Sequence, residues 1–470
     1  MLDPDSETRD RLMEDVYRYA SRYLDSVPQA PAYFSRPDLG VGMLDTEISE
    51  EGIGINRVLE LIDRHVDSVG INTTSGRFLG YIPGGGLFYS ALGDFLAAVS
   101  NRYAGVFFAS PGAARMENQL IRWMGDVVGY PAGCQGYLAS GGSMANLTAI
   151  VTARDEHGIE GALTSRAVVY LTEHAHHCIG KALNVVGLRS CIRREVPVDA
   201  SHRMIPAELE SMIQSDRRAG LTPFLVIASA GTTNTGSVDP LEPIGQLAQS
   251  YGLWYHVDGA YGAFFALCPE GKEVLQGLEM SDSLVMDPHK TMFLPYGTGA
   301  LLVRDGGKLR ASHASAAAYL QDTAGDHQEV SPSDLSPELT KHFRGLRLWL
   351  PLQVVGVAPF RAALSEKIQL ARYFHERMSE VDGFEMGSYP ELSVATYRYV
   401  PKRGDADAFN RALLKAIHAD GRIFVTSTQI NGRFSLRMAA VCFRTHLEDI
   451  EIAVETLTDT ARRLEATGTS

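Results

Sequence analysis

Two polar side chains stand at the ends of apolar segments in the middle of the chain and could take part in chemistry. Asp258 closes the run 253–258, and Lys290 follows the run 283–287 in the sequence Asp-Pro-His-Lys. A carboxylate that ends a buried strand is costly unless it meets a cation or hydrogen-bond donors, although it could also cap the next helix. A lysine in a concave site can become a nucleophile when burial lowers its pKa. The alternative is that Lys290 is an ordinary surface lysine.

A turn rich in glycine and serine, Ala139–Asn146, leads into the helical pattern LTAIVTAR. Backbone N–H groups at the start of a helix point outward, and the helix dipole favours an anion there, so Gly142 and Ser143 could bind a phosphate. The alternative is a serine-capped helix that follows a tight turn.

A third segment, Thr172–His177, contains three histidines within four positions. His174 and His176 are two residues apart, as metal ligands on one strand face would be, but no third ligand follows at a suitable spacing. One histidine could instead present its flat ring to a planar ligand, or all three could be ordinary loop residues. We predict no metal site.

Together these segments match the needs of one cofactor, pyridoxal 5'-phosphate. This cofactor requires a lysine that forms a Schiff base with its aldehyde, a carboxylate that keeps its pyridine nitrogen protonated, and amides and hydroxyls that anchor its phosphate. Because Lys290, Asp258 and the glycine-rich turn supply all three, the stacked-ring interpretation of the histidine segment becomes the better one.

The elements that must position these residues alternate between apolar runs and helical patterns. Runs that are apolar at every residue indicate strands covered on both faces, and their alternation with helices indicates a parallel or mixed sheet of the α/β class. Ligands of such sheets bind at the carboxyl ends of the strands. The predicted strands are 167–171, 224–230, 253–258, 283–287 and 299–303.

The two ends of the chain differ from this middle part. The first 60 residues read as a helix, a proline-rich connector and a second helix that covers about 55–69, whereas a long helical stretch after 350 leads into a small α+β lobe. We therefore predict three parts: an N-terminal helical dimerisation segment (1–85), a large cofactor-binding domain (86–350) and a small C-terminal domain (351–470).

The overall composition narrows the class of protein further. The 470 residues carry a net charge of −13, which disfavours nucleic acid as a partner. No apolar run reaches the length of about 18 residues that a membrane span needs, and the acidic N-terminus is unlike a secretory signal. The five cysteines are scattered without paired spacing. These features predict a location in a reducing cytoplasm, away from membranes.

The sequence resembles the group II pyridoxal-phosphate-dependent amino acid decarboxylases, which include the aromatic amino acid and glutamate decarboxylases. The resemblance is carried by HVDGAYGAF at 256–264 and DPHK at 287–290, and it extends to RFLGYIPGGG, ASPGAARMENQLIRWM and FRGLRLWLPL. It implies fold type I: a large domain with a mixed, mostly parallel seven-stranded sheet, an N-terminal helical segment and a small C-terminal α+β domain. It also implies a homodimer with the active site at the interface.

The resemblance assigns roles to individual residues. Lys290 matches the Schiff-base lysine, Asp258 the partner of the pyridinium nitrogen, and His176 the ring that stacks on the cofactor. The other implied cofactor-binding residues are Gly142, Ser143, Thr233, Ala260 and His289. The residues expected to bind the amino acid substrate are Tyr81, Arg102, Tyr103 and Tyr296. The tyrosines favour an aromatic or large side chain through stacking, whereas Arg102 would favour an acidic one.

The expected reaction is decarboxylation of an L-amino acid to an amine and CO2, through a Schiff base at Lys290 and a quinonoid intermediate. Relatives place a tyrosine that reprotonates the substrate carbon about a dozen residues before FRGLRLW, where this chain reads VSPSD. His327 is then the expected acid, and Tyr319 lies farther upstream. Without that tyrosine, dioxygen could intercept the carbanion and yield an aldehyde.

Transamination, aldol cleavage and elimination are further fates of the same carbanion. A second departure from the family is Asp287, which stands where many relatives carry asparagine.

Overall fold

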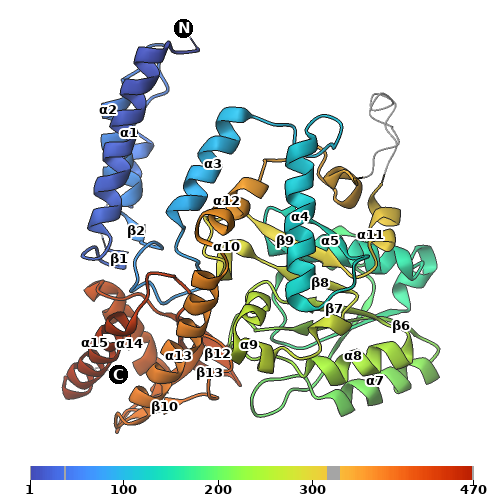
Figure 1. The fold of residues 1–470 in the computed structure, drawn as a ribbon. Helices are drawn as coiled ribbons and strands as arrows, with labels where there is room; N and C mark the ends of the chain where they lie inside the picture. Colours follow the sequence, from blue (N-terminus) through green and yellow to red (C-terminus); the bar gives the residue numbers. More distant parts are fainter. Residues whose placement is uncertain (1, 36–38, 315–328, 468–470) are drawn as a thin grey trace. The chain divides into compact units, whose positions relative to one another are not determined.

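The computed structural model describes residues 2–35, 39–314 and 329–467 (Figure 1). The chain divides into two compact units. The first unit contains residues 1–81, 374–386 and 396–470, and the second contains residues 82–373 and 387–395. The domain boundaries after residues 85 and 350 remain a prediction.

A seven-stranded sheet forms the centre of the second unit, with the strand order β3-β9-β8-β7-β6-β4-β5. The strands β5, β4, β6, β7 and β8 pair in parallel, whereas β9 runs antiparallel to both β8 and β3. The mixed, mostly parallel sheet that we predicted is therefore confirmed. The strands are β3 (Gln135–Ala139), β4 (Ala167–Leu171), β5 (Ile192–Glu195), β6 (Thr222–Ser229), β7 (Trp254–Asp258), β8 (Ser283–Met286) and β9 (Gly299–Val303).

The five strands predicted from apolar runs all exist, and their ends differ from the prediction by at most two residues. The two strands without such a run, β3 and β5, lie at the edges of the sheet. In β5 the residues alternate between partly buried and exposed, so its sequence Ile-Arg-Arg-Glu has no continuous apolar run. An edge strand with one solvated face does not need such a run.

Helices cover both faces of this sheet. Figure 1 shows α7 and α8 on one side and α5 on the other. On its own side, α5 contributes Ala145, Ala149 and Ile150 to a core shared with Val169, Leu225 and Leu301 of the sheet. The helices of the second unit are α3 (Phe88–Ser100), α4 (Pro111–Val128), α5 (Gly142–Glu156), α6 (Cys178–Val185), α7 (Pro206–Arg218), α8 (Leu241–Tyr251), α9 (Pro269–Val274), α10 (Pro288–Thr291), α11 (Gly306–His313) and α12 (Gly345–Val355).

The first unit contains the two ends of the chain. Its N-terminal part has the two predicted helices, α1 (Ser6–Ser26) and α2 (Ile55–Ile62), and a two-stranded ribbon of β1 (Tyr33–Phe34) and β2 (Gly70–Ile71). The second helix was expected to reach about residue 69, but α2 ends at Ile62 and a π-helical turn, Asp63–Asp67, follows it. Asp5 starts α1 by accepting a hydrogen bond from the backbone of Thr8 at 2.8 Å. Its C-terminal part has the sheet β10-β11-β13-β12 with two helices. These elements are β10 (Phe384–Met386), β11 (Val394–Tyr399), α14 (Ala406–Asp420), β12 (Thr426–Ile430), β13 (Arg433–Ala439) and α15 (Leu447–Ala466).

The long helical stretch expected after residue 350 is two helices. α12 ends at Gly356, which has a φ of +73°, and α13 (Ala358–Ser379) runs on from the second unit into the first. In the described residues no single helix is long and apolar enough to cross a membrane; α12 and α13 reach that length and composition only as a pair bent by 98°.

Candidate active site

The sheet topology brings the predicted functional segments to one edge. Since β9 is antiparallel to β8 and β3 is antiparallel to β9, β3 runs in the same direction as β4, β6, β7 and β8. Their carboxyl ends therefore lie at the same edge of the sheet, where ligands of α/β proteins bind. The glycine-rich turn, the histidine segment, Asp258 and the Asp-Pro-His-Lys segment all follow directly from these strand ends.

A cavity of 380 Å³ opens at this edge. All eight residues predicted to bind the cofactor line it: Gly142, Ser143, His176, Thr233, Asp258, Ala260, His289 and Lys290. Gly142 begins α5, so the positive end of a 15-residue helix faces the cavity. Separate segments of the sequence are thus gathered into a single site, while the role of each residue stays a prediction.

Asp258 receives hydrogen bonds from two directions. Asn146 donates through Nδ2 to Asp258 Oδ2 at 3.2 Å, and the backbone of Ala260 donates to Oδ1 at 3.2 Å. Both partners can only donate here, so the carboxyl group acts purely as an acceptor.

A buried chain of hydrogen bonds extends behind Asn146. His256 lies 2.7 Å from Asn146 Oδ1 through Nε2 and 2.8 Å from Ser283 Oγ through Nδ1, and Trp254 Nε1 donates to Ser283 Oγ at 2.8 Å. An amide oxygen only accepts and an indole N–H only donates, so the Nε2–H of His256 donates to Asn146 and Ser283 donates to Nδ1. Burial lowers the pKa of His256 to about 4, which keeps its ring neutral. Every donor in this chain therefore points toward Asp258.

Lys290 forms an ion pair inside the cavity. Its Nζ lies 3.0 Å from Asp287 Oδ2, and Asp287 is 1% exposed. Burial alone would lower the pKa of Lys290, but the negative charges of Asp287 and Asp258 outweigh that effect and raise it. The amine is therefore a paired ammonium, which must give up a proton before it can attack a carbonyl.

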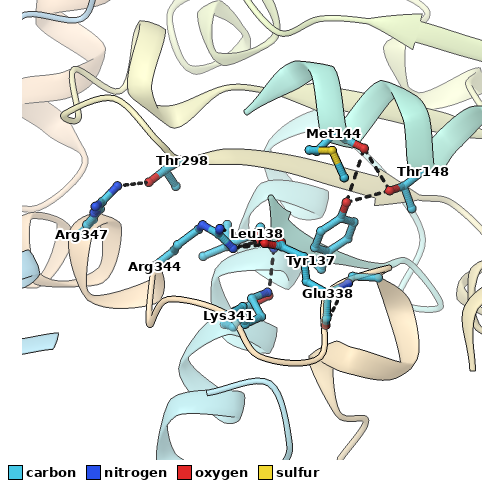
Figure 2. Close-up of polar contacts among 11 residues, drawn as sticks. Tyr137, Leu138, Met144, Thr148, Thr298, Glu338, Lys341, Arg344 and Arg347 are labelled. Carbon is cyan, nitrogen blue, oxygen red and sulfur yellow. Dashed lines mark hydrogen bonds and ion pairs between the residues drawn. The ribbon is translucent and has the colours of Figure 1, made fainter. Parts of the chain in front are cut away.

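His289 is held by the chain that follows it. Its Nδ1 lies 2.6 Å from the carbonyl oxygen of Thr298, so Nδ1–H is the donor and Nε2 remains for the cavity. Arg347 holds the segment 296–298 in place. Its guanidinium donates to Thr298 Oγ1 at 3.3 Å (Figure 2) and to the carbonyl oxygen of Tyr296 at 3.0 Å. Arg347 is itself held by Asp94 through two hydrogen bonds of 2.8 Å. Burial lowers the pKa of His289, so its ring is neutral.

Two further histidines line the cavity. The backbone of Cys178 donates to His176 Nδ1 at 3.3 Å, which leaves the proton of the neutral ring on Nε2. Burial lowers the pKa of both His174 and His176. In the described part of the chain, no group of three or more His, Cys, Asp or Glu side chains is arranged to hold a metal ion.

Charged side chains complete the free edge of β3, the strand that leads into the glycine-rich turn. Glu117 accepts a hydrogen bond from the backbone N–H of Leu138 at 2.9 Å. Arg344 donates to the Leu138 carbonyl at 3.3 Å (Figure 2). The two side chains take the place of a neighbouring strand. Tyr137 connects the same strand to α5 through Thr148 Oγ1 at 2.7 Å. The entrance to the turn is therefore held on both sides.

Gly142 is closely packed at the wall of the cavity. A Cβ atom at Gly142 would lie 2.7 Å from Asp287 Oδ2, so only glycine fits at the first position of the helix. The lining offers an amine, a carboxylate, neutral imidazole rings and hydroxyl groups, which is the set of donors that pyridoxal phosphate requires. The residues present therefore fit this cofactor.

The predicted substrate residues are not gathered with the others. Arg102, Tyr103 and Tyr296 belong to the second unit, but none of them is among the residues that line the cavity. The Tyr296 ring is 60% exposed and lies 6.0 Å from the His289 ring. Tyr81 belongs to the first unit and is 56% exposed. His327, the predicted acid, and Tyr319 lie outside the described residues.

The segment that reads VSPSD has a defined structure without a tyrosine. Residues Pro332–Leu335 form a short 3-10 helix, in which Pro332 and Leu335 are buried. Ser331 Oγ accepts a hydrogen bond from the backbone of Phe107 at 3.0 Å, and Ser333 donates to the carbonyl of Gly105 at 2.9 Å. These contacts hold the segment against Gly105 and Phe107 of the same unit.

Sequence reasoning overlooked several residues of the site. Asn146 and His174 stood in segments that we had singled out, but we assigned them no role. Glu117 and Arg347 stood in segments that carried the family resemblance, but we assigned them no role, and Lys341 was not singled out, because charged residues far apart in the sequence form no local pattern. Asp287 was noted only as a departure from the family.

Comparison with known proteins identifies the relatives of this chain. Residues 37–400 match the family described as the pyridoxal-dependent decarboxylase conserved domain. The chain is 32% identical to an aromatic-L-amino-acid decarboxylase of Bacillus atrophaeus over 87% of this chain and 85% of that protein. It is 30% identical to a phenylacetaldehyde synthase of Petunia hybrida over 81% of this chain and 79% of that protein.

The structure is similar to the crystal structure of Oryza sativa TDC with PLP and tryptamine, with a TM-score of 0.91, 25% identity and coverage of 98% of this chain and 99% of that one. It is also similar in fold to Rhodiola rosea 4-hydroxyphenylacetaldehyde synthase, with a TM-score of 0.89, 23% identity and coverage of 98% and 99%. The predicted fold type I is confirmed by these similarities.

Proposed function

The chain belongs to the pyridoxal-dependent decarboxylase family, and from that premise we propose that it converts an aromatic L-amino acid to an amine and CO2. As a member of this family it is a carboxy-lyase that depends on pyridoxal phosphate. The observation that carries the proposal is the cavity itself, where Lys290, Asp258 and Gly142 meet in a chain related to aromatic amino acid decarboxylases.

Three parts of the cavity would hold the cofactor. Lys290 would bind its aldehyde carbon through Nζ, Asp258 would keep a proton on its ring nitrogen, and Gly142 and Ser143 would bind its phosphate through N–H and hydroxyl groups. When bound, pyridoxal phosphate supplies an electron sink for the electron pair that remains on the substrate carbon after CO2 leaves.

The surrounding side chains would orient this chemistry. The hydrogen-bond chain from Trp254 through His256 to Asn146 keeps Asp258 a pure acceptor, so its negative charge stays directed into the cavity. His176 offers a neutral ring that can lie against a planar cofactor. Lys290 begins as an ammonium paired with Asp287, so a proton leaves Nζ before the amine reacts.

The preference for an aromatic substrate rests on the relatives and on the predicted pocket residues. The related proteins include tryptophan and tyrosine decarboxylases. Tyr296 does not line the cavity, but its ring lies 6.0 Å from that of His289, which does, and it could stack on an aromatic side chain of a substrate that extends out of the cavity. Arg102 would instead favour an acidic substrate, so glutamate is the comparison substrate.

A second candidate reaction is decarboxylation coupled to oxidative deamination, which yields an aldehyde, ammonia and CO2. The described residues 329–342, which immediately precede the Phe-Arg of FRGLRLW, contain no tyrosine. Relatives at 30% and 27% identity are phenylacetaldehyde synthases. Slow protonation of the substrate carbon would leave time for dioxygen to react.

We also propose that the protein is a homodimer in the cytoplasm. Helix α3 exposes one apolar face with helical spacing, formed by Phe88, Leu92, Phe95, Leu96 and Val99. A contiguous apolar face of this kind marks an interaction site, and a second copy of the chain would cover it. All five cysteines are free and buried, which suits a reducing compartment.

Product analysis tests the proposal directly. Protein loaded with pyridoxal phosphate is incubated with phenylalanine, tyrosine, tryptophan and glutamate, and amine, aldehyde, ammonia and oxygen uptake are measured. Amine from an aromatic substrate without oxygen uptake supports the first reaction, and aldehyde with oxygen uptake supports the second. Turnover of glutamate alone would contradict the aromatic preference.

A further inference from the structure

Asp287 occupies an unusual position for a second carboxylate in this cavity. Its side chain lies between two glycines: a Cβ atom at Gly142 would lie 2.7 Å from Oδ2, and a Cβ atom at Gly299 would lie 2.6 Å from Oδ1. Asp287 is only 1% exposed. The carboxylate is therefore packed against the first residue of α5, where an anion is favoured.

The two carboxylate oxygens of Asp287 have different surroundings. Oδ2 lies 3.0 Å from Lys290 Nζ and 3.8 Å from Nε2 of His289, a neutral ring. Oδ1 is buried and has no hydrogen-bond partner among the described residues. Asp258, the other carboxylate of the cavity, has two donors of its own. One buried oxygen of Asp287, packed against Gly299, is thus left without compensation in the wall of the cavity, which is costly unless the site uses it.

We propose that Asp287 acts as an internal anion, which holds the Lys290 ammonium and competes with the cofactor's phosphate for the N-terminus of α5. Asp287 pairs with the Lys290 ammonium at 3.0 Å and packs against Gly142 at the positive end of α5, so it already contacts both positive groups. A phosphate that enters beside Gly142 must share them with a fixed negative charge. The carboxylate therefore weakens phosphate binding, and the cofactor exchanges more readily than it would with a neutral side chain at this position.

This inference depends on the cofactor and not on whether the product is an amine or an aldehyde. Asp287 could act in two ways: on the reactivity of Lys290 alone, or also on the binding of the phosphate, as we infer. Asp287→Asn keeps the shape of the side chain and removes the charge, so it separates the two roles. Asp282→Asn is the matched control, since Asp282 is also a largely buried carboxylate but precedes β8 at the opposite end of the strand and accepts from the Tyr255 backbone at 2.8 Å.

The experiment measures the binding of three probes to apo-protein: inorganic phosphate, pyridoxal phosphate and pyridoxal, which lacks the phosphate. Calorimetry or competition gives each dissociation constant for the wild type and for both variants. In Asp287→Asn we expect the constant for inorganic phosphate to fall at least tenfold, which corresponds to about 1.4 kcal/mol. The ratio of the pyridoxal constant to the pyridoxal phosphate constant should rise by a similar factor. Asp282→Asn should change neither quantity.

Two results would overturn the inference. One is unchanged or weaker binding of inorganic phosphate to Asp287→Asn. The other is an equal gain for pyridoxal and pyridoxal phosphate, which would mean that Asp287 acts on Lys290 only. If Asp287→Asn does not fold, Asp287→Ser removes the same charge with a smaller side chain, and the same three constants decide the question. Because no substrate is present, a wrong proposal about the reaction would leave this result intact.

Discussion

Glu117 and Lys341 form an ion pair of 2.6 Å although they are 224 positions apart in the sequence. Both side chains are almost completely buried. Glu117 also accepts the N–H of Leu138 one residue before β3 ends, and the glycine-rich turn follows directly. The pair therefore joins β3, which leads into the glycine-rich turn, to the segment just before α12.

Removal of one partner of this pair should be strongly destabilising. Glu117→Gln leaves the Lys341 ammonium buried without a counter-charge, which costs about 3–5 kcal/mol in buried pairs. Replacement of both residues, as in Glu117→Gln with Lys341→Met, should recover part of that loss. Chemical unfolding measures the free energy, and Glu380→Gln is the control. Glu380 pairs with Arg377 at 2.7 Å but on the surface, so we expect at most about 1 kcal/mol there. Equal losses for Glu117→Gln and Glu380→Gln would contradict the role of burial.

The hydrogen-bond chain behind Asp258 should be needed for turnover. Asn146→Ala leaves the Nε2–H of His256 without an acceptor and removes one donor from Asp258. An unsatisfied buried polar group costs about 1–3 kcal/mol, so we expect a loss of stability of that size and a fall in turnover of about tenfold or more. Asn184→Ala is the control, because Asn184 accepts only from Arg193 at an exposed site. A fully active Asn146→Ala variant would show that Asp258 does not depend on this chain.

Asp258→Ala tests the carboxylate itself. Without it no described side chain at the end of β7 can hold a proton on the cofactor's ring nitrogen, so the electron sink is lost. We expect weak cofactor binding and no measurable turnover. Retained turnover in this variant would remove Asp258 from the chemistry.

Acid should destabilise the protein through His256. Burial holds its pKa at about 4, whereas the unfolded chain has the ordinary value of about 6.5. The unfolded state therefore binds more protons between these values, and stability is present above about pH 6.5 and lost as the pH falls toward 4. Between pH 7 and 5 this residue should account for about 2 kcal/mol. The buried Asp239, with its pKa raised to about 6 by burial, acts in the opposite direction over part of the same range.

The variant His256→Gln isolates this contribution. Glutamine keeps a donor for Asn146 but does not titrate, so the difference in unfolding free energy between pH 7 and 5 should shrink by about 2 kcal/mol. The unfolding of both proteins is measured at the two pH values. An unchanged difference would assign the acid sensitivity to other groups.

The sequence allowed the main elements of the site to be predicted because each leaves a local pattern. Asp258 and Lys290 each follow an apolar run, and parallel strands bring their carboxyl ends to one edge. The glycine-rich turn was recognisable because Gly142 has no space for a Cβ atom beside Asp287. Local rules of burial and turn geometry thus singled out Asp258, Lys290 and the glycine-rich turn, whereas Thr233, Ala260 and His289 were implied by the family resemblance alone.

The contacts that hold these residues in place could not be predicted in the same way. The carbonyl of Thr298 orients His289, and Arg347 holds that segment from another part of the chain. A guanidinium group gives no indication in the sequence of which carbonyl it will reach. Tyr296 was expected among the cavity residues, but its side chain turns out 60% exposed. Such outcomes depend on tertiary packing, which sequence periodicity does not encode.

The identity of the acid that protonates the substrate carbon remains a prediction, and His327 is our candidate. We expect His327→Phe to shift the product from amine toward aldehyde, because slower protonation gives dioxygen more time. The ratio of amine to aldehyde is measured with oxygen uptake. Tyr319→Phe is the control from the same segment and should leave the ratio unchanged. A shift in the control alone would assign the proton to Tyr319.

The exposed face of α3 should determine the oligomeric state. Leu92 and Phe95 lie on this face and are 41% and 45% exposed in the single chain. A second copy that covers them would remove apolar surface from water, whereas Leu92→Arg would place a charge in the interface. We expect the wild type to sediment as a dimer and Leu92→Arg as a monomer. Val185→Arg is the matched control, because Val185 is 72% exposed on α6, away from this face. If the wild type is monomeric, or if Leu92→Arg remains a dimer, α3 does not form the interface.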